Sequence, residues 1–241
     1  MAIRIETIPE TGSTSADLLA RLAAAERVPE GHWLVAGRQT AGRGRQGRRW
    51  LDAPGNFMGS TVVHLSPQDP LPATLSFVAA LAVYEAVLPR LAQPRDLQLK
   101  WPNDVLLRGD KFCGILLERE GHHAVVGIGV NLAAAPQVPD RTVRSLADEG
   151  PAPLQAAFAT ELAFRFDQEL ARWRQFGLGP TLVRWLAAAH PAGTPLTVHD
   201  PAGERIAGTF EGLDPDGALR LRLADGSARV IHAGDVTLEG G

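Results

Sequence analysis

The pattern of apolar and polar residues predicts both strands and helices over the first 190 residues. Short apolar or alternating runs indicate strands, at residues 3–8, 33–36, 55–64, 97–101, 105–107, 111–118 and 124–132. Apolar residues at helical spacing indicate helices, at residues 17–26, 72–91, 154–176 and 180–190. This succession predicts an α+β fold, in which a β-sheet packs against helices.

The pattern changes beyond residues 191–195. Four further strands are predicted close together, at residues 196–199, 205–213, 218–223 and 229–232, with Asp-Gly turns between the later ones. A run of short strands in about 50 residues is typical of a small β-barrel. We therefore predict two domains, at residues 1–190 and 191–241.

Composition and charge narrow the class of protein. The 241 residues suffice for one large and one small domain, and the net charge of −3 argues against a general nucleic-acid binder. The single cysteine, Cys113, excludes an internal disulfide and fits a reducing compartment. The sequence shows no secretory leader and no apolar run near the roughly 20 residues that span a bilayer. We therefore expect a cytoplasmic protein without a membrane anchor.

Residues 37–50 are the most unusual stretch of the sequence. They hold five arginines, no acid and interior glycines at positions 42, 44 and 47. Glycines let the backbone approach a ligand and guanidinium groups bind carboxylate or phosphate, so we interpret the stretch as an anion-binding loop. The alternative is a solvated turn or a loose nucleic-acid contact. The stretch matches neither a P-loop nor a Gly-x-Gly-x-x-Gly dinucleotide site.

The two lysines mark a second informative stretch. Of the 24 basic residues 22 are arginines, so Lys100 and Lys111 suggest places where a compact ammonium group is needed. Lys111 begins a predicted strand and either neutralises a reacting acyl phosphate or is an exposed hairpin end. Asn103 and Asp104 suit a sugar or a partly hydrated Mg²⁺, or they form an Asn-Asp turn. Gly114 interrupts the strand, as where a ligand approaches closely.

Three further polar residues each have a structural and a functional interpretation. Ser13 and Thr14 precede a predicted helix, where they either cap it or offer hydroxyl groups to a ligand. Asn131 ends an apolar strand and is either a turn residue or part of a site. Cys113 is interpreted as a buried apolar residue, because no His/Asp pattern accompanies it.

Five stretches, taken together and in order, form a recognisable set. They are Ser13-Thr14, Gln39-Thr-Ala-Gly-Arg-Gly-Arg-Gln-Gly-Arg-Arg-Trp50, Lys100-Trp-Pro-Asn-Asp104, Lys111-Phe-Cys-Gly-Ile-Leu-Leu-Glu118 and Gly127-Ile-Gly-Val-Asn131. The set closely resembles the biotin protein ligases, also named biotin–[acetyl-CoA-carboxylase] ligases. The second and third stretches are highly specific to that family, and the resemblance covers nearly the whole chain.

The resemblance implies a fold and a two-step reaction. The implied fold is a class II synthetase-like catalytic domain, a mixed sheet with helices on one side, followed by an SH3-like β-barrel. In the implied reaction, the biotin carboxylate attacks the α-phosphate of Mg-ATP, which gives biotinyl-5′-adenylate and pyrophosphate. A lysine of a biotin carboxyl carrier protein, expected to be the carrier subunit of acetyl-CoA carboxylase, then displaces AMP and forms an amide.

The resemblance also implies roles for individual residues. Those implied for biotin are Ser13, Thr14, Gln39, Gly42, Arg43, Gly44, Arg45, Lys111 and Gly114. Those implied for the nucleotide are Trp50, which would stack on adenine, Asn103, Asp104 and Asn131, with Asp104 also the candidate Mg²⁺ ligand. The implied catalytic residues are Lys111, Arg43 and Arg45.

The sequence departs from the family pattern in two respects. Family members often carry Asp-Ser-Thr-Asn where this chain has Gly12-Ser-Thr-Ser15, so Ser15 is a doubtful nucleotide contact. No helix-turn-helix precedes the ligase-like part, so we expect the monofunctional form without DNA binding.

The nearest rival is a lipoate ligase or octanoyl transferase, but the Gly-Gly-Gly typical of those enzymes does not follow Arg48-Arg49. The second rival, a nucleic-acid-binding protein, disagrees with the acidic remainder of the chain. Relatives often dimerise through a sheet edge, so a homodimer is also expected.

Overall fold

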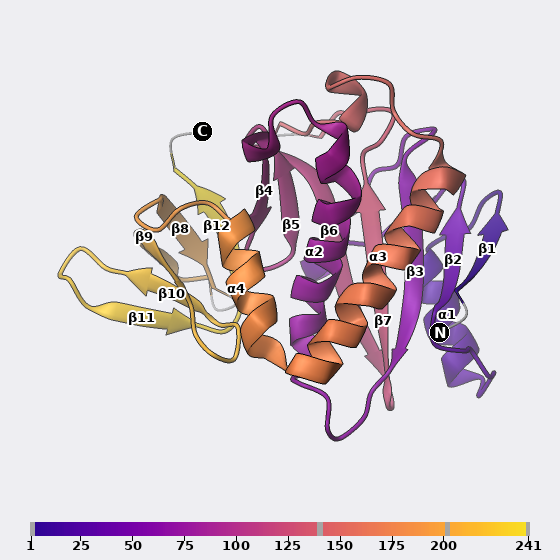
Figure 1. Ribbon diagram of the computed structural model, residues 1–241, viewed down its shortest axis with the longest axis horizontal. Coiled ribbons are helices and arrows are strands. Elements are labelled where there is room, and N and C mark those ends of the chain that lie inside the picture. Colours follow the sequence, from indigo (N-terminus) through magenta and orange to yellow (C-terminus); the bar gives the residue numbers. More distant parts are fainter. Residues whose placement is uncertain (1–2, 139–141, 201–202, 240–241) are drawn as a thin grey trace.

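A seven-stranded β-sheet forms the main part of the computed structural model, which describes residues 3–138, 142–200 and 203–239 (Figure 1). Its strands are β1 (Arg4–Ile8), β2 (His32–Ala36), β3 (Phe57–His64), β4 (Leu97–Lys100), β5 (Asp104–Leu107), β6 (Asp110–Glu120) and β7 (His123–Val130). The order across the sheet is β1-β2-β3-β7-β6-β5-β4. The β1–β2 pair is parallel and the other pairs are antiparallel, so the predicted mixed sheet is confirmed.

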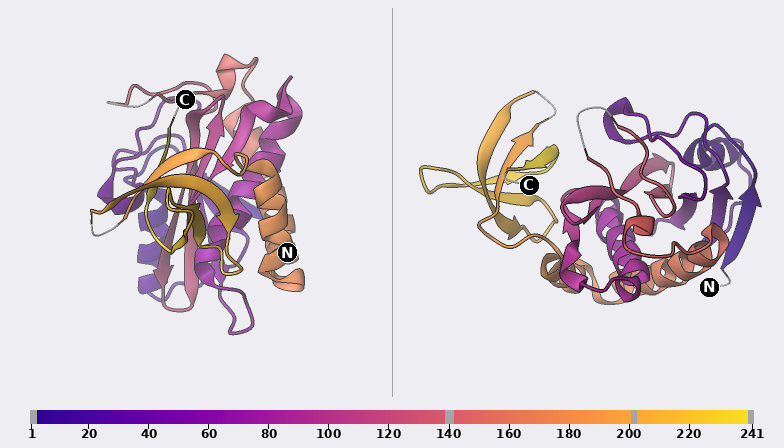
Figure 2. Two further views of the ribbon diagram at one scale, coloured as in Figure 1. Left: turned by 90° about the vertical axis from the view of Figure 1, so that its left-hand side faces the viewer. Right: turned by 90° about the horizontal axis from the view of Figure 1, so that it is seen from above.

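Helices cover both faces of this sheet. The helices α2 (Leu75–Val87), α3 (Gln155–Phe176) and α4 (Leu178–Ala188) lie along one face, and α1 (Thr14–Ala23) packs on the other (Figure 2). In β2, Trp33 belongs to the large core on the α2 side, whereas Leu34 packs with Leu18 of α1 in a small separate cluster. The expectation of helices on one side was therefore incomplete, because β2 is buried on both faces and needs cover on each.

A second, antiparallel sheet follows the helices. Its strands are β8 (Pro195–His199), β9 (Arg205–Leu213), β10 (Leu219–Arg222), β11 (Ala228–Ile231) and β12 (Asp235–Leu238), in the order β11-β10-β9-β8-β12. The arrangement agrees with a small SH3-like domain. Among the described residues, the edge strands β11 and β12 do not pair with each other, so the sheet does not close into a barrel. The sequence-based prediction lacked β12, because its four residues include only two apolar ones.

The boundaries of two helices differ most from the prediction. The helix predicted at residues 72–91 is α-helical only in α2, and 3₁₀ turns flank it at residues 72–74 and 88–90. Helix α1 begins three residues earlier than predicted, and Ser13 caps it by accepting a hydrogen bond from the Ala16 N–H at 3.4 Å. The capping interpretation of Ser13 is therefore confirmed.

One helical segment of the described chain is long and apolar enough to cross a membrane by length and composition alone. This segment, Pro72–Arg90, contradicts the expectation that no apolar run approaches that length. However, 67% of its most apolar window is buried inside the fold. The segment is therefore the core helix of the domain.

The two sheets meet through a continuous apolar core. The indole N–H of Trp101 donates to the carbonyl of Gly217 in the β9–β10 turn at 3.1 Å. His190 is buried beside this junction, with its ring centroid 4.5 Å from that of Phe210 in β9. Buried residues of both sheets belong to one cluster. The division of the chain near residue 190 remains a prediction.

The His190→Leu variant should lose less stability than the wild type when the pH is lowered. Burial, and to a lesser extent the charge of Lys100, lowers the pKa of His190 from 6.5 to about 4. Between these values the unfolded chain binds a proton that the folded chain does not, so the free energy of unfolding falls by at most roughly 1.4 kcal/mol per pH unit. Urea unfolding at a pH of about 7.5 and of about 5 measures this loss, and equal losses in both proteins would contradict it.

Candidate active site

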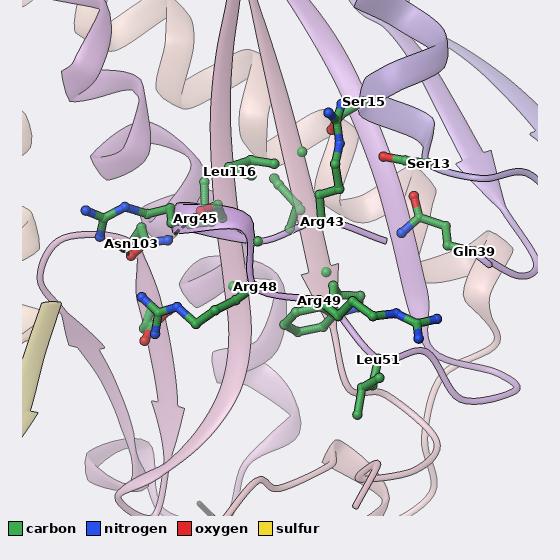
Figure 3. A pocket seen from close by; sticks show the side chains of 18 of the residues that line it. Ser13, Ser15, Gln39, Arg43, Arg45, Arg48, Arg49, Leu51, Asn103 and Leu116 are labelled. Atoms are coloured by element: carbon green, nitrogen blue, oxygen red, sulfur yellow. Dashed lines mark hydrogen bonds between the residues drawn. The ribbon is translucent and has the colours of Figure 1, made fainter. Parts of the chain in front are cut away.

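A pocket opens on the α1 face of the large sheet, over β3, β6 and β7 (Figure 3). The start of α1, the Arg/Gly loop (residues 37–50) and the β4–β5 turn form its walls, and Asp235 reaches it from the second sheet. The pocket therefore gathers the five stretches that the sequence singled out.

One end of the pocket is a cluster of buried hydroxyl and amide groups. The Thr14 Oγ1 lies 2.7 Å from the Ser60 Oγ and donates to the Gln39 Oε1 at 3.0 Å. The Ser15 Oγ lies 2.9 Å from the Ser60 Oγ. The backbone N–H of Thr14 also donates to the Gln39 Oε1, at 2.8 Å. Because these groups fix one another, they form a preorganised set of donors and acceptors for a small polar ligand.

Backbone hydrogen bonds give the Arg/Gly loop a defined shape. The Trp50 N–H donates to the carbonyl of Gly42 at 2.9 Å, and the Gly44 N–H donates to that of Arg48 at 2.7 Å. A Cβ on Gly42 would lie 2.8 Å from the Trp50 carbonyl oxygen, so only glycine fits there. These bonds bring residues 42–44 and 48–50 together, so the arginines of this segment project from a closed turn.

The arginines of the loop reach different parts of the pocket. Figure 3 shows Arg43 and Arg45 extending in different directions. The Arg43 Nη2 lies 3.3 Å from the Glu118 Oε1 on β6, and the Arg45 Nη1 donates to the Asn103 Oδ1 at 3.1 Å. The loop therefore offers permanent positive charge along the length of the pocket.

The floor beneath the loop is flat because it is built from glycines. Gly114 of β6 and Gly129 of β7 are register partners, and the Trp50 indole lies over both. A Cβ on Gly114 would lie 3.0 Å from the Trp50 Cζ3, and one on Gly129 would overlap the indole. A Cβ on Gly127 would overlap the Ser15 hydroxyl. Ring systems can therefore lie directly on the backbone of two adjacent strands.

Both lysines of the chain converge on Asp104. The Lys111 Nζ donates to the Asp104 Oδ1 at 2.6 Å, and the Lys100 Nζ lies 3.5 Å from the Oδ2. Burial alone would raise the pKa of the Asp104 carboxyl, but Lys111 and Lys100 outweigh it and hold that pKa below 3.8. Asp104 is therefore ionised at neutral pH and fixes the Lys111 ammonium at the pocket.

This arrangement fits a bound Mg²⁺ poorly. Mg²⁺ prefers several oxygen ligands around it, and each oxygen of Asp104 already contacts an ammonium group. Among the described residues no group of three or more His, Cys, Asp or Glu side chains could hold a metal ion. The donor set at Asp104 matches a pair of lysines better than a metal ion.

Two asparagines and the cysteine have clear surroundings. The Asn103 Nδ2 donates to the carbonyl of Ile115 at 2.6 Å, and the Asn131 Nδ2 donates to that of Arg144 at 3.2 Å. Both amides are therefore held in place at the pocket. Cys113 is fully buried and burial raises the pKa of its thiol, which agrees with its interpretation as an apolar residue.

The structure brings nearly all of the predicted site residues to one pocket. Those that line it are Ser13, Thr14, Gln39, Arg43, Gly44, Arg45, Trp50, Asn103, Asp104, Lys111, Gly114 and Asn131. Gly42 is not among the lining residues, and it packs against the Trp50 carbonyl within the loop. The sequence analysis did not assign Ser60, Arg48, Gly129 or Asp235 to the site, although each lines it. Arg48 and Gly129 belong to stretches that the motif comparison had already marked, whereas Ser60 and Asp235 lie outside them.

Comparison with known families bears directly on this pocket. The model of the biotin/lipoate A/B protein ligase family matches residues 11–131, and that of the biotin protein ligase C terminal domain matches residues 195–238. The chain belongs to the biotin/lipoate A/B protein ligase family. The first match contains every predicted site residue, and the second covers the small sheet.

Individual members of the family resemble the chain over nearly its whole length. A biotin–[acetyl-CoA-carboxylase] ligase of Paracoccus denitrificans is 39% identical over 244 residues, which cover 97% of this chain and 100% of the relative. One of Mycobacterium tuberculosis is 37% identical and covers 97% of this chain and 88% of the relative. The structure of the Aquifex aeolicus biotin protein ligase in complex with biotin and ATP matches with a TM-score of 0.84 at 25% identity, over 99% of both chains.

Proposed function

We infer that the protein is an ATP-dependent biotin ligase. Its full-length relatives are biotin–[acetyl-CoA-carboxylase] ligases, and a ligase of closely similar structure binds biotin and ATP. The observation that carries the assignment is a single pocket that joins a buried hydroxyl cluster to an arginine-rich loop and a lysine. This combination suits a ligand with a small polar head, an apolar tail and an acid at its far end.

The reaction proceeds in two group transfers. In the first, a carboxylate oxygen of biotin bonds to the α-phosphorus of ATP, the bond to the β-phosphate oxygen breaks, and pyrophosphate leaves. In the second, a lysine amine of the acceptor attacks the acyl carbon, AMP leaves with the electron pair of the broken bond, and the amine loses a proton. The product is an amide.

The hydroxyl cluster is the proposed site for the biotin ureido ring. The backbone N–H and the hydroxyl group of Thr14 both donate to the Gln39 Oε1, and the Ser60 hydroxyl extends the cluster. A ureido group has one carbonyl acceptor and two N–H donors, which such a cluster can satisfy together. Gly114 lets the rest of biotin lie against β6.

Lys111, Arg43 and Arg45 are the proposed groups that act on the reacting atoms. Asp104 holds the Lys111 ammonium, and the two arginines approach from the loop above. Positive charge at this point stabilises the charge that develops between carboxylate and phosphate. The loop, with Gly44, would also exclude water from the mixed anhydride.

The nucleotide is proposed to bind at the Asn103 end of the pocket. Asn103, Asn131 and Trp50 are assigned there, with the Trp50 indole placed to stack on adenine. Mg²⁺ would arrive with the phosphates of ATP, because Asp104 is committed to the lysines. We assign Asp104 to holding Lys111.

We further propose an acceptor protein and a cellular location. The proposed acceptor is a lysine of the biotin carboxyl carrier protein of acetyl-CoA carboxylase, and the proposed location is the cytoplasm. A homodimer through an edge of the large sheet remains a proposal, and β1 is such an edge. No DNA or membrane partner is proposed.

ATP–pyrophosphate exchange with purified protein tests the function. We expect exchange with biotin and none with lipoate or octanoate, since the hydroxyl cluster suits a ureido ring and not a dithiolane ring or a bare alkyl chain. Exchange with lipoate alone would move the chain to the lipoate branch of the family. An absence of exchange with all three acids would overturn the assignment.

A further inference from the structure

A carboxylate of the small C-terminal sheet reaches into the pocket and pairs with the Arg/Gly loop. Arg48 forms an ion pair with the Asp235 carboxylate, and the Arg45 Nη1 lies 3.5 Å from its Oδ1. The Arg45 Nη2 also donates to the Gly234 carbonyl at 3.3 Å. Two arginines of the loop thus share one anchor that is more than 180 residues away in the chain.

The two sides of this contact differ in how firmly they are held. Asp235 is the first residue of β12 and the register partner of His199 in β8. A Cβ on Gly234 would lie 2.8 Å from the Val198 Cγ1 and 3.0 Å from the His199 carbonyl oxygen, so this backbone is pressed against β8. By contrast, residues 45–47 form a short 3₁₀ turn without a buried side chain. The strand is therefore the fixed partner.

We propose that Asp235 is a positioning residue that tethers the Arg/Gly loop to the C-terminal sheet and holds Arg45 and Arg48 at the nucleotide end of the pocket. Arg43 has its own partner, Glu118, so the tether acts on the second half of the loop. The small sheet then contributes to the active site through one side chain. The kinetic part of this proposal rests on the proposed function.

The first test needs no substrate. Trypsin should cleave the loop after Arg45 or Arg48 about 10-fold faster in Asp235→Asn than in the wild type, because loop opening exposes these bonds. Glu204→Gln is the matched control, since it removes a carboxylate that precedes β9 and pairs with Arg229 of β11 at 2.8 Å, and should leave loop cleavage unchanged. Equal cleavage of the loop in Asp235→Asn and Glu204→Gln would overturn the tether.

The second test uses biotin-dependent exchange. Asp235→Asn should raise the KM for ATP about 10-fold with little change in biotin affinity, and Asp235→Glu should recover most of the loss. A purely structural role of Asp235 would weaken both ligands together. If the wild type shows no exchange with biotin, the proposed function fails while the proteolysis test still decides the tether.

A double variant tests whether Arg48 acts through Asp235. Arg48→Gln removes the same contact from the exposed loop, so it also serves if Asp235→Asn folds poorly. Asp235→Asn combined with Arg48→Gln should cost about as much as Asp235→Asn alone, because Asp235→Asn already breaks the Arg48 contact. Effects on the KM for ATP that multiply would overturn the proposal.

Discussion

Replacing Lys111 with alanine is expected to slow adenylate formation by about 100- to 1,000-fold while changing biotin affinity little. Charge builds up between carboxylate and phosphate mainly in the transition state, so a cation placed there lowers the barrier more than it tightens binding. Single-turnover adenylation and equilibrium binding of biotin measure the two quantities separately.

Two further variants separate the charge of Lys111 from its contact with Asp104. In Lys111→Gln the amide can still donate to the carboxylate but is neutral, so the rate should remain as low as in Lys111→Ala. Lys100→Gln removes the other ammonium from the same carboxylate, and its effect on the rate should be much smaller because Lys100 does not line the pocket. A rate restored by Lys111→Gln, or an equal loss of rate and biotin affinity, would refute the assigned role.

A single methyl group on the glycine floor should be nearly as damaging. Gly129→Ala is expected to lower kcat/KM for biotin by about 10- to 100-fold, because overpacking costs roughly 1–3 kcal/mol and about 1.4 kcal/mol is tenfold. The added Cβ would overlap the Trp50 indole and lift it, together with the loop end, from β7. Exchange kinetics at varied biotin concentration measure the effect.

The control for this prediction adds the same methyl group elsewhere. Gly179 is exposed in α4, and a Cβ there would meet nothing within 4 Å. Gly179→Ala should therefore leave exchange unchanged. Equal kinetics for Gly129→Ala and Gly179→Ala would show that the floor tolerates a side chain, which would count against a flat platform.

The sequence revealed those parts of the site whose residues lie close together in the chain. The Arg/Gly loop and Lys111 stand out locally, because clustered arginines and glycines suit a bound anion and lysine occurs only twice in the chain. Ser60 did not stand out, because a small polar residue in a strand has no local signal. Asp235 gave no local signal in the sequence either. Its partner Arg48 is 187 residues away, and only the packing of the two sheets brings them together.

The fold shows the same contrast between local and distant information. Periodicity located the strands and helices within a few residues, since it reports which side of each element is buried. It did not say that α1 covers the opposite face from α2, because strand β2 is apolar on both sides and its pattern is the same whichever helix covers it. Strand β12 was missed because only two of its four residues are apolar, so its pattern gives little signal without its partner β8.

The pairing of both lysines with Asp104 has a consequence for self-modification. A biotinyl adenylate acylates amines. The ligase that forms the adenylate is also the first protein that a released adenylate molecule can meet. The chain has only two lysines, their side chains are 17% and 25% exposed, and both ammonium groups contact the same carboxylate. With arginine as its other positive side chain, the protein offers its own reactive product almost no side-chain nucleophile of the acceptor's kind.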